Sequence, residues 1–293
     1  MKRLPVHILF AIIVFVAIFY SNSAYSPEIQ NQTFAQSQIV AKKIKIVVVA
    51  GHDNSTWGAK FMGVKEVELN RILADYLYDF LKNDPLFEPT KNQENGDYIP
   101  ELAQYFKDNE AKIVAYRKER RETFDKKEIG LDINEDEMIH NEVTEDVANN
   151  LYGTSMWAEE KYFDVMIHIH FNDYPGRPKD KAGKYRGFVV YSPSKYLKNG
   201  EKSIPLARAI YDELAKFQPK SNLPVEKDGL IESNELIALG ARNSLSVPSV
   251  LIEYAYIAEP RLQGVGREAV IKDMAYQTYV GIKGFYEKKA GEN

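Results

Sequence analysis

Apolar residues follow two different spacings along the chain, and each spacing predicts a type of secondary structure. Residues 44–50 (IKIVVVA) are β-branched and almost wholly apolar, which is typical of a strand buried on both faces of a parallel sheet. Residues 165–171 (VMIHIHF) alternate between an apolar face and a face that carries two histidines. Two shorter strands are expected at 188–191 and 250–253, since Gly, Pro or Ser bounds each of them.

Helical spacing separates these strands. Apolar side chains recur every three or four residues in three segments, 69–81, 206–217 and 267–288. Strands that alternate with helices predict the α/β class, here a single domain with a mainly parallel central sheet flanked by helices. Ligands of such sheets bind beyond the carboxyl ends of the strands, so residues at those ends are the first candidates for a site.

A charge-dense segment, residues 92–150, interrupts this pattern. Its apolar residues are widely spaced, which predicts a helical insertion made of one long exposed helix and an acidic connection. The simplest interpretation is a solvated excursion with no active role. Lids and binding segments must be easy to displace, so the alternatives are a lid over the site or a docking arm.

The N-terminus predicts export. Lys2 and Arg3 precede an apolar stretch, residues 4–20, which suits either a signal peptide covering residues 1–24 or an uncleaved membrane anchor. The basic end stays in the cytoplasm in both cases, so a polar linker at 25–43 and a domain at 44–288 follow it to the outside. The predicted localisation is therefore extracytoplasmic.

Composition narrows the chemistry. Lys and Arg number 38 against 42 Asp and Glu, which gives a formal net charge of −4. Nucleic-acid-binding proteins are normally basic, so no nucleic-acid partner is expected. The absence of cysteine excludes disulfides, cysteine nucleophiles and cysteine-based metal sites. Any metal must therefore be held by Asp, Glu or one of the 5 histidines.

An imidazole and a carboxylate stand at the first two element boundaries. His52 follows the first strand, where Gly51 allows a sharp exit of the chain. Glu66 lies in the first turn of the first helix, on its inward-facing stripe. An acid at this position either complements the helix dipole, which is the ordinary reason, or binds a metal ion.

The other candidates lie on two later strands. His168 and His170 share one strand face beside Asn172, and Glu253 ends an otherwise apolar strand. Each residue alone is ordinary, since a lone histidine in a strand is usually part of the core. Two histidines and one carboxylate form a catalytic zinc set with room for water, and a further Glu can act as the base. The four positions together favour such a site at one edge of the sheet.

Several short motifs link these candidates to a known family. They are GHDN at 51–54, GA at 58–59, Glu66 followed by Asn70 and Ala74, HIHFN at 168–172 and PSVLIE at 248–253. With these motifs, residues 44–286 resemble the zinc-dependent N-acetylmuramoyl-L-alanine amidases, which cut peptidoglycan between N-acetylmuramic acid and the L-alanine of the stem peptide. The resemblance implies a bacterial cell-wall hydrolase whose partner is peptidoglycan, with room for a regulatory protein partner.

The resemblance also implies a role for each matching residue. The Zn²⁺ ligands correspond to His52, Glu66 and His170. Glu253 corresponds to the catalytic acid and base. His168 replaces the usual serine of the family, and we expect it and Asn172 to be outer partners that support the ligands; the alternative for His168 is a fourth ligand.

Two questions about substrate stay open in the sequence. The loop 173–186 is basic, and Arg177, Lys184 and Arg186 are expected to contact a carboxylate of the anionic stem peptide, although a solvated basic loop has the same composition. Besides the amidase, the alternatives are another zinc peptidase that acts on free peptides and a non-catalytic wall-binding protein. The latter is expected to lack a ligand or Glu253, and this chain retains all of them.

Overall fold

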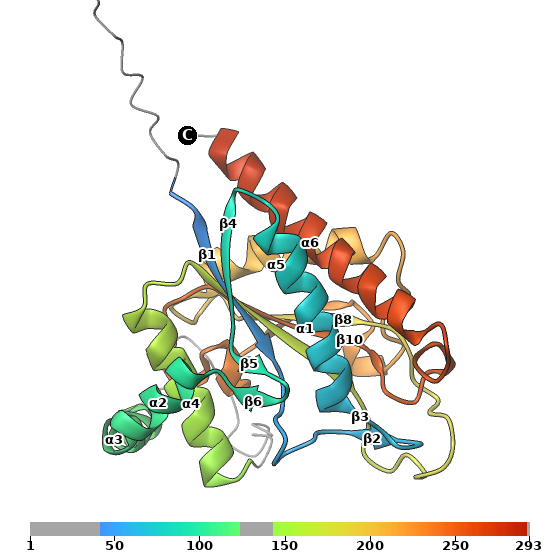
Figure 1. Cartoon of the computed structure of the whole chain (residues 1–293), viewed down its shortest axis with the longest axis horizontal. Helices are drawn as coiled ribbons and strands as arrows, with labels where there is room; N and C mark the ends of the chain where they lie inside the picture. Colours follow the sequence, from blue (N-terminus) through green and yellow to red (C-terminus); the bar gives the residue numbers. More distant parts are fainter. Residues whose placement is uncertain (1–41, 124–142, 292–293) are drawn as a thin grey trace, which may run out of the picture. The chain divides into compact units, whose positions relative to one another are not determined.

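Six strands form the central sheet of the computed structural model, which describes residues 42–123 and 143–291 (Figure 1). Their order is β4-β1-β7-β10-β8-β9. The first four run parallel to one another, whereas β8 pairs antiparallel with β10 and parallel with β9. The sheet strands are β1 (Ile44–Ala50), β4 (Phe87–Lys91), β7 (Val165–Asn172), β8 (Val189–Pro193), β9 (Leu230–Ser233) and β10 (Ser249–Tyr256). Two hairpins add β2 (Lys60–Phe61) with β3 (Val64–Lys65), and β5 (Gln93–Glu94) with β6 (Asp97–Tyr98).

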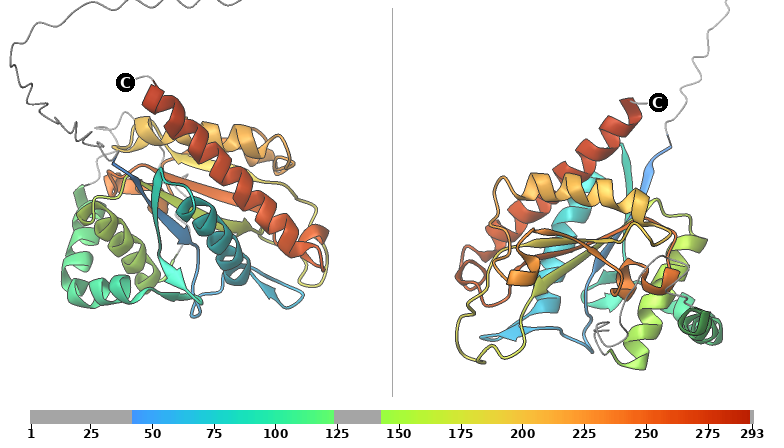
Figure 2. Two further views of the ribbon diagram at one scale, coloured as in Figure 1. Left: turned by 45° about the horizontal axis from the view of Figure 1, so that its top comes forward. Right: turned by 180° about the vertical axis from the view of Figure 1, so that it is seen from behind.

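Helices cover both faces of this sheet (Figure 2). One face carries α1 (Glu66–Lys82), α5 (Gly200–Leu214) and α6 (Arg267–Gly291). The other carries α2 (Pro100–Asp108) and α4 (Glu145–Glu160), with α3 (Glu110–Thr123) packed against α4. Short 3₁₀ turns lie at η2 (Pro224–Glu226), η3 (Ile237–Leu239), η4 (Ala241–Asn243) and η5 (Pro260–Leu262).

The strand β1 shows why the sequence folds in three layers. Ile46 and Val48 lie in the core beneath α1, α5 and α6, while Val47 and Val49 lie in the core beneath α2 and α4. All four side chains are buried, as expected for a strand covered on both faces. The predicted α/β class with a mainly parallel sheet is therefore confirmed. The reversed direction of β8 is an addition that the sequence pattern did not indicate.

The predicted insertion is in part wrong. Residues 92–123 form the β5–β6 hairpin and two helices, not one long exposed helix, and Leu102 of α2 is fully buried beside Val47 and Trp157. The α2 and α4 helices bury apolar side chains against the sheet and α3 packs on α4, so they are a layer of the fold and not a solvated excursion. Most of the acidic connection lies outside the described residues, so the lid and the docking arm stay predictions.

The predicted signal or anchor at residues 1–24 also lies outside the described residues. In the part that the structure describes, no helix is both long and apolar enough to cross a bilayer. The described residues belong to one compact unit, and the first of them, Lys42, lies close to the predicted end of the linker.

Candidate metal centre

Three neighbouring parallel strands bring the predicted site residues to one edge of the sheet. The β10 strand pairs with β7 so that Glu253 lies opposite His170. The β1 strand flanks β7 on its other side and ends directly before the Gly51-His52 pair. Because side chains at paired positions point to the same face, Glu253 and both β7 histidines face the side of the sheet that α2 and α4 cover.

His52, Glu66 and His170 form a compact cluster, in which one possible ligand atom from each residue lies within 4.8 Å of the others. Glu66 lies between the two imidazoles, with Oε2 at 3.2 Å from His52 Nε2 and Oε1 at 3.1 Å from His170 Nδ1. Its carboxylate also accepts hydrogen bonds from the backbone N–H groups of Ala59 (2.9 Å) and Phe171 (3.3 Å). Both oxygens of this 5 % exposed residue are thus held in place.

Close backbone approach explains two glycines of the motif. A Cβ on Gly58, whose φ is +70°, would lie 2.3 Å from Glu66 Oε2 and 2.5 Å from His52 Cδ2. A Cβ on Gly51 would lie 2.2 Å from His170 Cε1. The cluster therefore fills the space that side chains would need, and only glycine fits at these positions.

Charge interactions inside the cluster favour an ionised carboxylate. Burial alone would raise the pKa of Glu66, but the hydrogen bonds and charges of His170 and His52 outweigh burial and hold that pKa well below its usual range. Burial likewise acts to lower the pKa of His52, and Glu66 outweighs it and raises that pKa. A buried anion between two imidazoles is a donor set that suits a divalent cation.

Glu253 lies beside this cluster but takes no part in its hydrogen bonds. Its Oε2 atom is buried and has no hydrogen-bond partner among the described residues. Burial and the charges of Glu66 and Glu226 raise the pKa of Glu253 well above its usual value. An acid with a raised pKa beside a candidate metal centre is a candidate for proton transfer.

The sequence analysis missed Glu226, which lies in η2 and lines the same cavity. Its buried carboxylate accepts four hydrogen bonds, two on each oxygen, from side chains on separate elements. The donors are Asn172 (2.9 Å), Tyr191 (3.0 Å), Ser221 (2.5 Å) and Tyr256 (2.7 Å). This carboxylate ties the ends of β7, β8 and β10 together next to the site. No periodicity or motif marks Glu226, because three of its four partners lie at least 30 residues away in the sequence.

The two predicted outer partners have other contacts. His168 is 2 % exposed, and its side chain makes no hydrogen bond to a cluster residue; Nε2 has no partner among the described residues. Burial, with a smaller effect of His170, lowers the pKa of His168 to about 3, so the ring is neutral. Asn172 donates to Glu226 and not to a cluster residue. Neither residue makes a hydrogen bond to a proposed ligand in the structure, and their role as outer partners stays a prediction.

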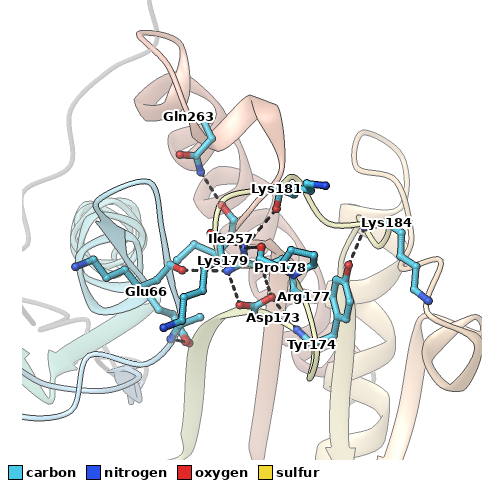
Figure 3. A network of polar contacts seen from close by, with 12 residues as sticks. Glu66, Asp173, Tyr174, Arg177, Pro178, Lys179, Lys181, Lys184, Ile257 and Gln263 are labelled. Carbon is cyan, nitrogen blue, oxygen red and sulfur yellow. Dashed lines mark hydrogen bonds and ion pairs between the residues drawn. The ribbon is translucent and has the colours of Figure 1, made fainter.

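Arg177 has partners within its own loop and on β2, and its predicted contact with a substrate stays a prediction (Figure 3). Its guanidinium forms a bidentate ion pair with Asp173, at 2.7 and 2.9 Å, and donates to the carbonyl of Lys60 at 3.0 Å. Further bonds run to carbonyls within the loop, and the side chain is only 5 % exposed. Arg177 therefore braces the loop and ties it to β2. Of the other two residues, Lys184 lies over the ring of Tyr185.

A cavity of about 840 Å³ opens at this edge of the sheet. The carboxylates that line it are those of Asp53, Glu66, Asp173, Glu226, Glu235 and Glu253. Among the described residues that line the cavity there is no Lys or Arg, so Arg177, Lys184 and Arg186 are all absent from its wall. The predicted contact of Lys184 and Arg186 with a substrate stays a prediction. The fold and site together define the class: an α/β protein with a candidate metal-binding set of side chains, and a buried acid beside it, at the edge of its sheet.

Comparison with known sequences gives the family. The family of N-acetylmuramoyl-L-alanine amidases matches residues 46–283, which is most of the chain, and the chain belongs to it. It is therefore an enzyme that cleaves the amide bond between N-acetylmuramic acid and L-alanine in peptidoglycan. No curated protein sequence matches the chain.

Solved structures show the same fold at low identity. An N-acetylmuramoyl-L-alanine amidase from Clostridium difficile 630 is 15 % identical, with a TM-score of 0.55 over 84 % of this chain and 98 % of that one. The CwlD amidase from Clostridioides difficile, in complex with the GerS lipoprotein, is 17 % identical, with a TM-score of 0.55 over 84 % and 99 %. An amidase from Mycobacterium smegmatis is 14 % identical, with a TM-score of 0.55 over 84 % and 97 %.

Proposed function

We propose that the chain cleaves this amide bond as a zinc-dependent hydrolase, with His52, Glu66 and His170 as metal ligands and Glu253 as the acid and base. The observation that carries the proposal is the buried Glu66 carboxylate between two imidazoles, next to the unpartnered Oε2 of Glu253. Two histidines and a carboxylate are a donor set that Zn²⁺ prefers, and such sets leave a position open for chemistry.

The charge of these residues suits a divalent metal ion, as do their donor atoms. Glu66 is ionised in the metal-free cluster, and the glycines leave room around the ligand atoms. Asn70 lies one turn along α1 and donates to the carbonyl of Gly51 at 2.9 Å and to Glu66 at 3.4 Å, which holds the first motif against the helix. When bound there, Zn²⁺ would lower the pKa of a water molecule to about 7, and the metal would also polarise the scissile carbonyl.

Glu253 performs the proton transfers in this proposal. Its raised pKa suits a group that accepts a proton from the attacking water and passes it to the amine of the departing L-alanine. The charges of Glu66 and Glu226 raise the pKa of Glu253, which favours its protonated form until the proton passes to the leaving amine. General acid–base catalysis of this kind contributes roughly 10²–10⁴-fold to the rate.

The test combines metal content with activity. A chain that starts near Val40 should copurify with one zinc per molecule and release the stem peptide from purified muropeptides, and a chelator should abolish both. A protein that keeps full activity without metal would contradict the zinc assignment. Comparison of muropeptides with the free stem peptide separates the amidase from the alternative zinc peptidase, and a protein that only sediments with sacculi would be a wall-binding protein.

Location and partners complete the proposal. Peptidoglycan lies outside the cytoplasmic membrane, so the proposed function agrees with an extracytoplasmic protein that residues 4–20 export or anchor. The complex of the CwlD amidase with the GerS lipoprotein supports a protein partner for this chain too. Cell fractionation with an antibody to the domain, followed by N-terminal sequencing, distinguishes an anchored chain from a cleaved one.

A further inference from the structure

Trp57 is an exposed aromatic side chain at the mouth of the candidate site. It lines the cavity, and 45 % of its surface is accessible. The chain has two tryptophans, and the other one, Trp157, is only 1 % exposed in the core. Large aromatic surfaces that stay open in a binding cavity usually contact a ligand.

The indole ring is held in one position. Its Nε1 donates to the carbonyl of Asn54 at 2.7 Å, and the backbone carbonyl of Trp57 accepts from Val67 at 3.2 Å. The preceding turn is closed by Asp53, which accepts four hydrogen bonds from the two residues after Asn54. A ring fixed in this way loses little conformational entropy when a ligand packs on it.

Two lysines of the β2–β3 hairpin form cation–π contacts with the indole ring. Lys65 Nζ lies 3.4 Å from the ring centroid, and Lys60 Nζ lies 5.9 Å from it. These lysines are directly opposite each other in the hairpin, where like charges repel, and the electron-rich indole between them offsets that repulsion. Lys65 thus contacts part of the ring, while Trp57 stays 45 % exposed and lines the cavity.

We propose that Trp57 is a stacking platform for the pyranose ring of the muramic acid whose amide is cleaved, an inference that rests on the proposed function. A Cβ on the next residue, Gly58, would meet Glu66 and His52, so the backbone one residue after Trp57 passes close to the candidate metal centre. In the substrate, the scissile carbonyl is joined to the sugar ring through one short lactyl ether. A carbonyl at the metal centre thus places the sugar ring close to Trp57.

The chemistry of the two partners also matches. One face of a pyranose presents polarised C–H groups, and the face of an indole carries the negative part of the ring quadrupole. The carboxylates elsewhere in the cavity repel the anionic stem peptide. A neutral contact to the sugar adds affinity for the substrate without this repulsion. Trp57 therefore makes the enzyme selective for glycan-linked peptide over the same peptide without sugar.

The kinetic test compares two substrates with the same scissile amide. One is a muramic acid linked to the stem peptide, and the other is a D-lactoyl stem peptide, which lacks the sugar ring. The wild-type enzyme should prefer the sugar-bearing substrate, and Trp57→Ala should reduce this preference in kcat/KM by about 10- to 30-fold. Trp57→Phe should restore most of the preference, because it keeps a flat aromatic face. The matched control is Met62→Ala, which removes an exposed apolar side chain of the nearby β2–β3 hairpin that does not line the cavity.

A binding test gives an answer that does not depend on catalysis. The disaccharide of N-acetylglucosamine and N-acetylmuramic acid should protect Trp57 from quenching by acrylamide in the zinc-loaded protein, while buried Trp157 gives a constant background. Protection without hydrolysis of either substrate would support the platform and contradict the proposed function. An unchanged preference in Trp57→Ala, or no protection at millimolar disaccharide while hydrolysis proceeds, would overturn the platform and leave the proposed function intact.

Discussion

Glu226 and Glu253 line the same cavity, and the charge of Glu226 helps to raise the pKa of Glu253. Their surroundings differ. Glu226 accepts four hydrogen bonds, whereas Oε2 of Glu253 has no partner in the described part of the chain. A proton that enters the cavity is therefore accommodated on Glu253, where no donor competes for the oxygen. This difference supports the proposed role of Glu253, and not of Glu226, in proton transfer.

The pair predicts a shift in the pH dependence of activity. A raised pKa keeps Glu253 protonated to a higher pH, so activity that needs its basic form should rise as the pH rises through that pKa. Glu226→Gln removes one of the charges that raise the pKa, so the acidic limb of kcat/KM should move to lower pH. Tyr191→Phe is the control, since it removes one donor and keeps the charge of Glu226. An unmoved limb in Glu226→Gln would contradict the coupling.

The same raised pKa predicts how the metal-free protein responds to pH. A carboxyl whose pKa is higher in the folded state stabilises the fold below the unfolded value of about 4.3, and this contribution is lost as the pH rises through the folded pKa. Glu253→Gln has no such loss. The melting temperature of the variant should therefore exceed that of wild type at pH 8, and the gap should narrow toward pH 4. A gap that widens on acidification would show that burial does not dominate.

The close approach of the backbone to the cluster predicts that two glycines differ in how well they tolerate alanine. Gly58 and Gly63 both have positive φ, but only a Cβ on Gly58 meets the cluster, since nothing lies within 4 Å of a Cβ on Gly63. Gly63→Ala should cost about 1 kcal/mol from backbone strain alone. Gly58→Ala should cost more and should also lower zinc content, because Glu66 and His52 must move. Thermal denaturation and elemental analysis of both variants check this. Equal zinc content in the two would show that a side chain at residue 58 does not disturb the cluster.

The proposed ligand set predicts two outcomes on one strand face. His170→Ala should lose zinc and activity, because two ligands hold the metal poorly. His168→Ser changes a histidine of the same face that is outside the cluster, and it should keep both zinc and activity. Metal loss in His168→Ser would place that imidazole among the groups that support the metal, contrary to the contacts in the structure.

The contacts of Arg177 predict that its substitution destabilises the fold, whereas substitution of Arg186 in the same loop does not. Arg177→Ala leaves Asp173 without its partner and should destabilise the fold by about 2–4 kcal/mol. Arg177→Lys should recover only part of this, since lysine cannot form the bidentate pair. Arg186→Ala, at an exposed position of the same loop, should stay within about 0.5 kcal/mol of wild type in urea denaturation. Similar losses in Arg177→Ala and Arg186→Ala would contradict the brace.

The sequence predicted the parts of the fold that depend on local pattern. The strands β1, β7 and β10 are apolar runs in the centre of the sheet, and His52, Glu66 and His170 come together because two strand ends and one helix start meet at one edge. The β4 strand (FEPTK) escaped prediction. It is at the edge of the sheet, where charged residues and a proline are tolerated, so its sequence does not look like a strand.

Tertiary contacts account for what the sequence did not predict. The α4 helix buries small and polar residues such as Thr154 and Ser155 along with Trp157, so it lacks a clear apolar stripe. Arg177 belongs to a basic loop, and only the folded chain shows that Asp173 and a carbonyl of the β2 strand occupy its guanidinium. In both cases the partners are set by packing and not by spacing.

The position of β10 in the sheet has a consequence for the order in which the chain gains its function. This strand comes near the end of the sequence, yet it inserts between β7 and β8 and carries Glu253. A growing or partly translocated chain that still lacks residues 249–256 has a gap in the middle of its sheet. Closing this gap requires contacts between distant parts of the chain, which form late in folding. The hydrolase is thus assembled only when nearly the whole domain has emerged, and a truncated product carries the three candidate ligands without the acid.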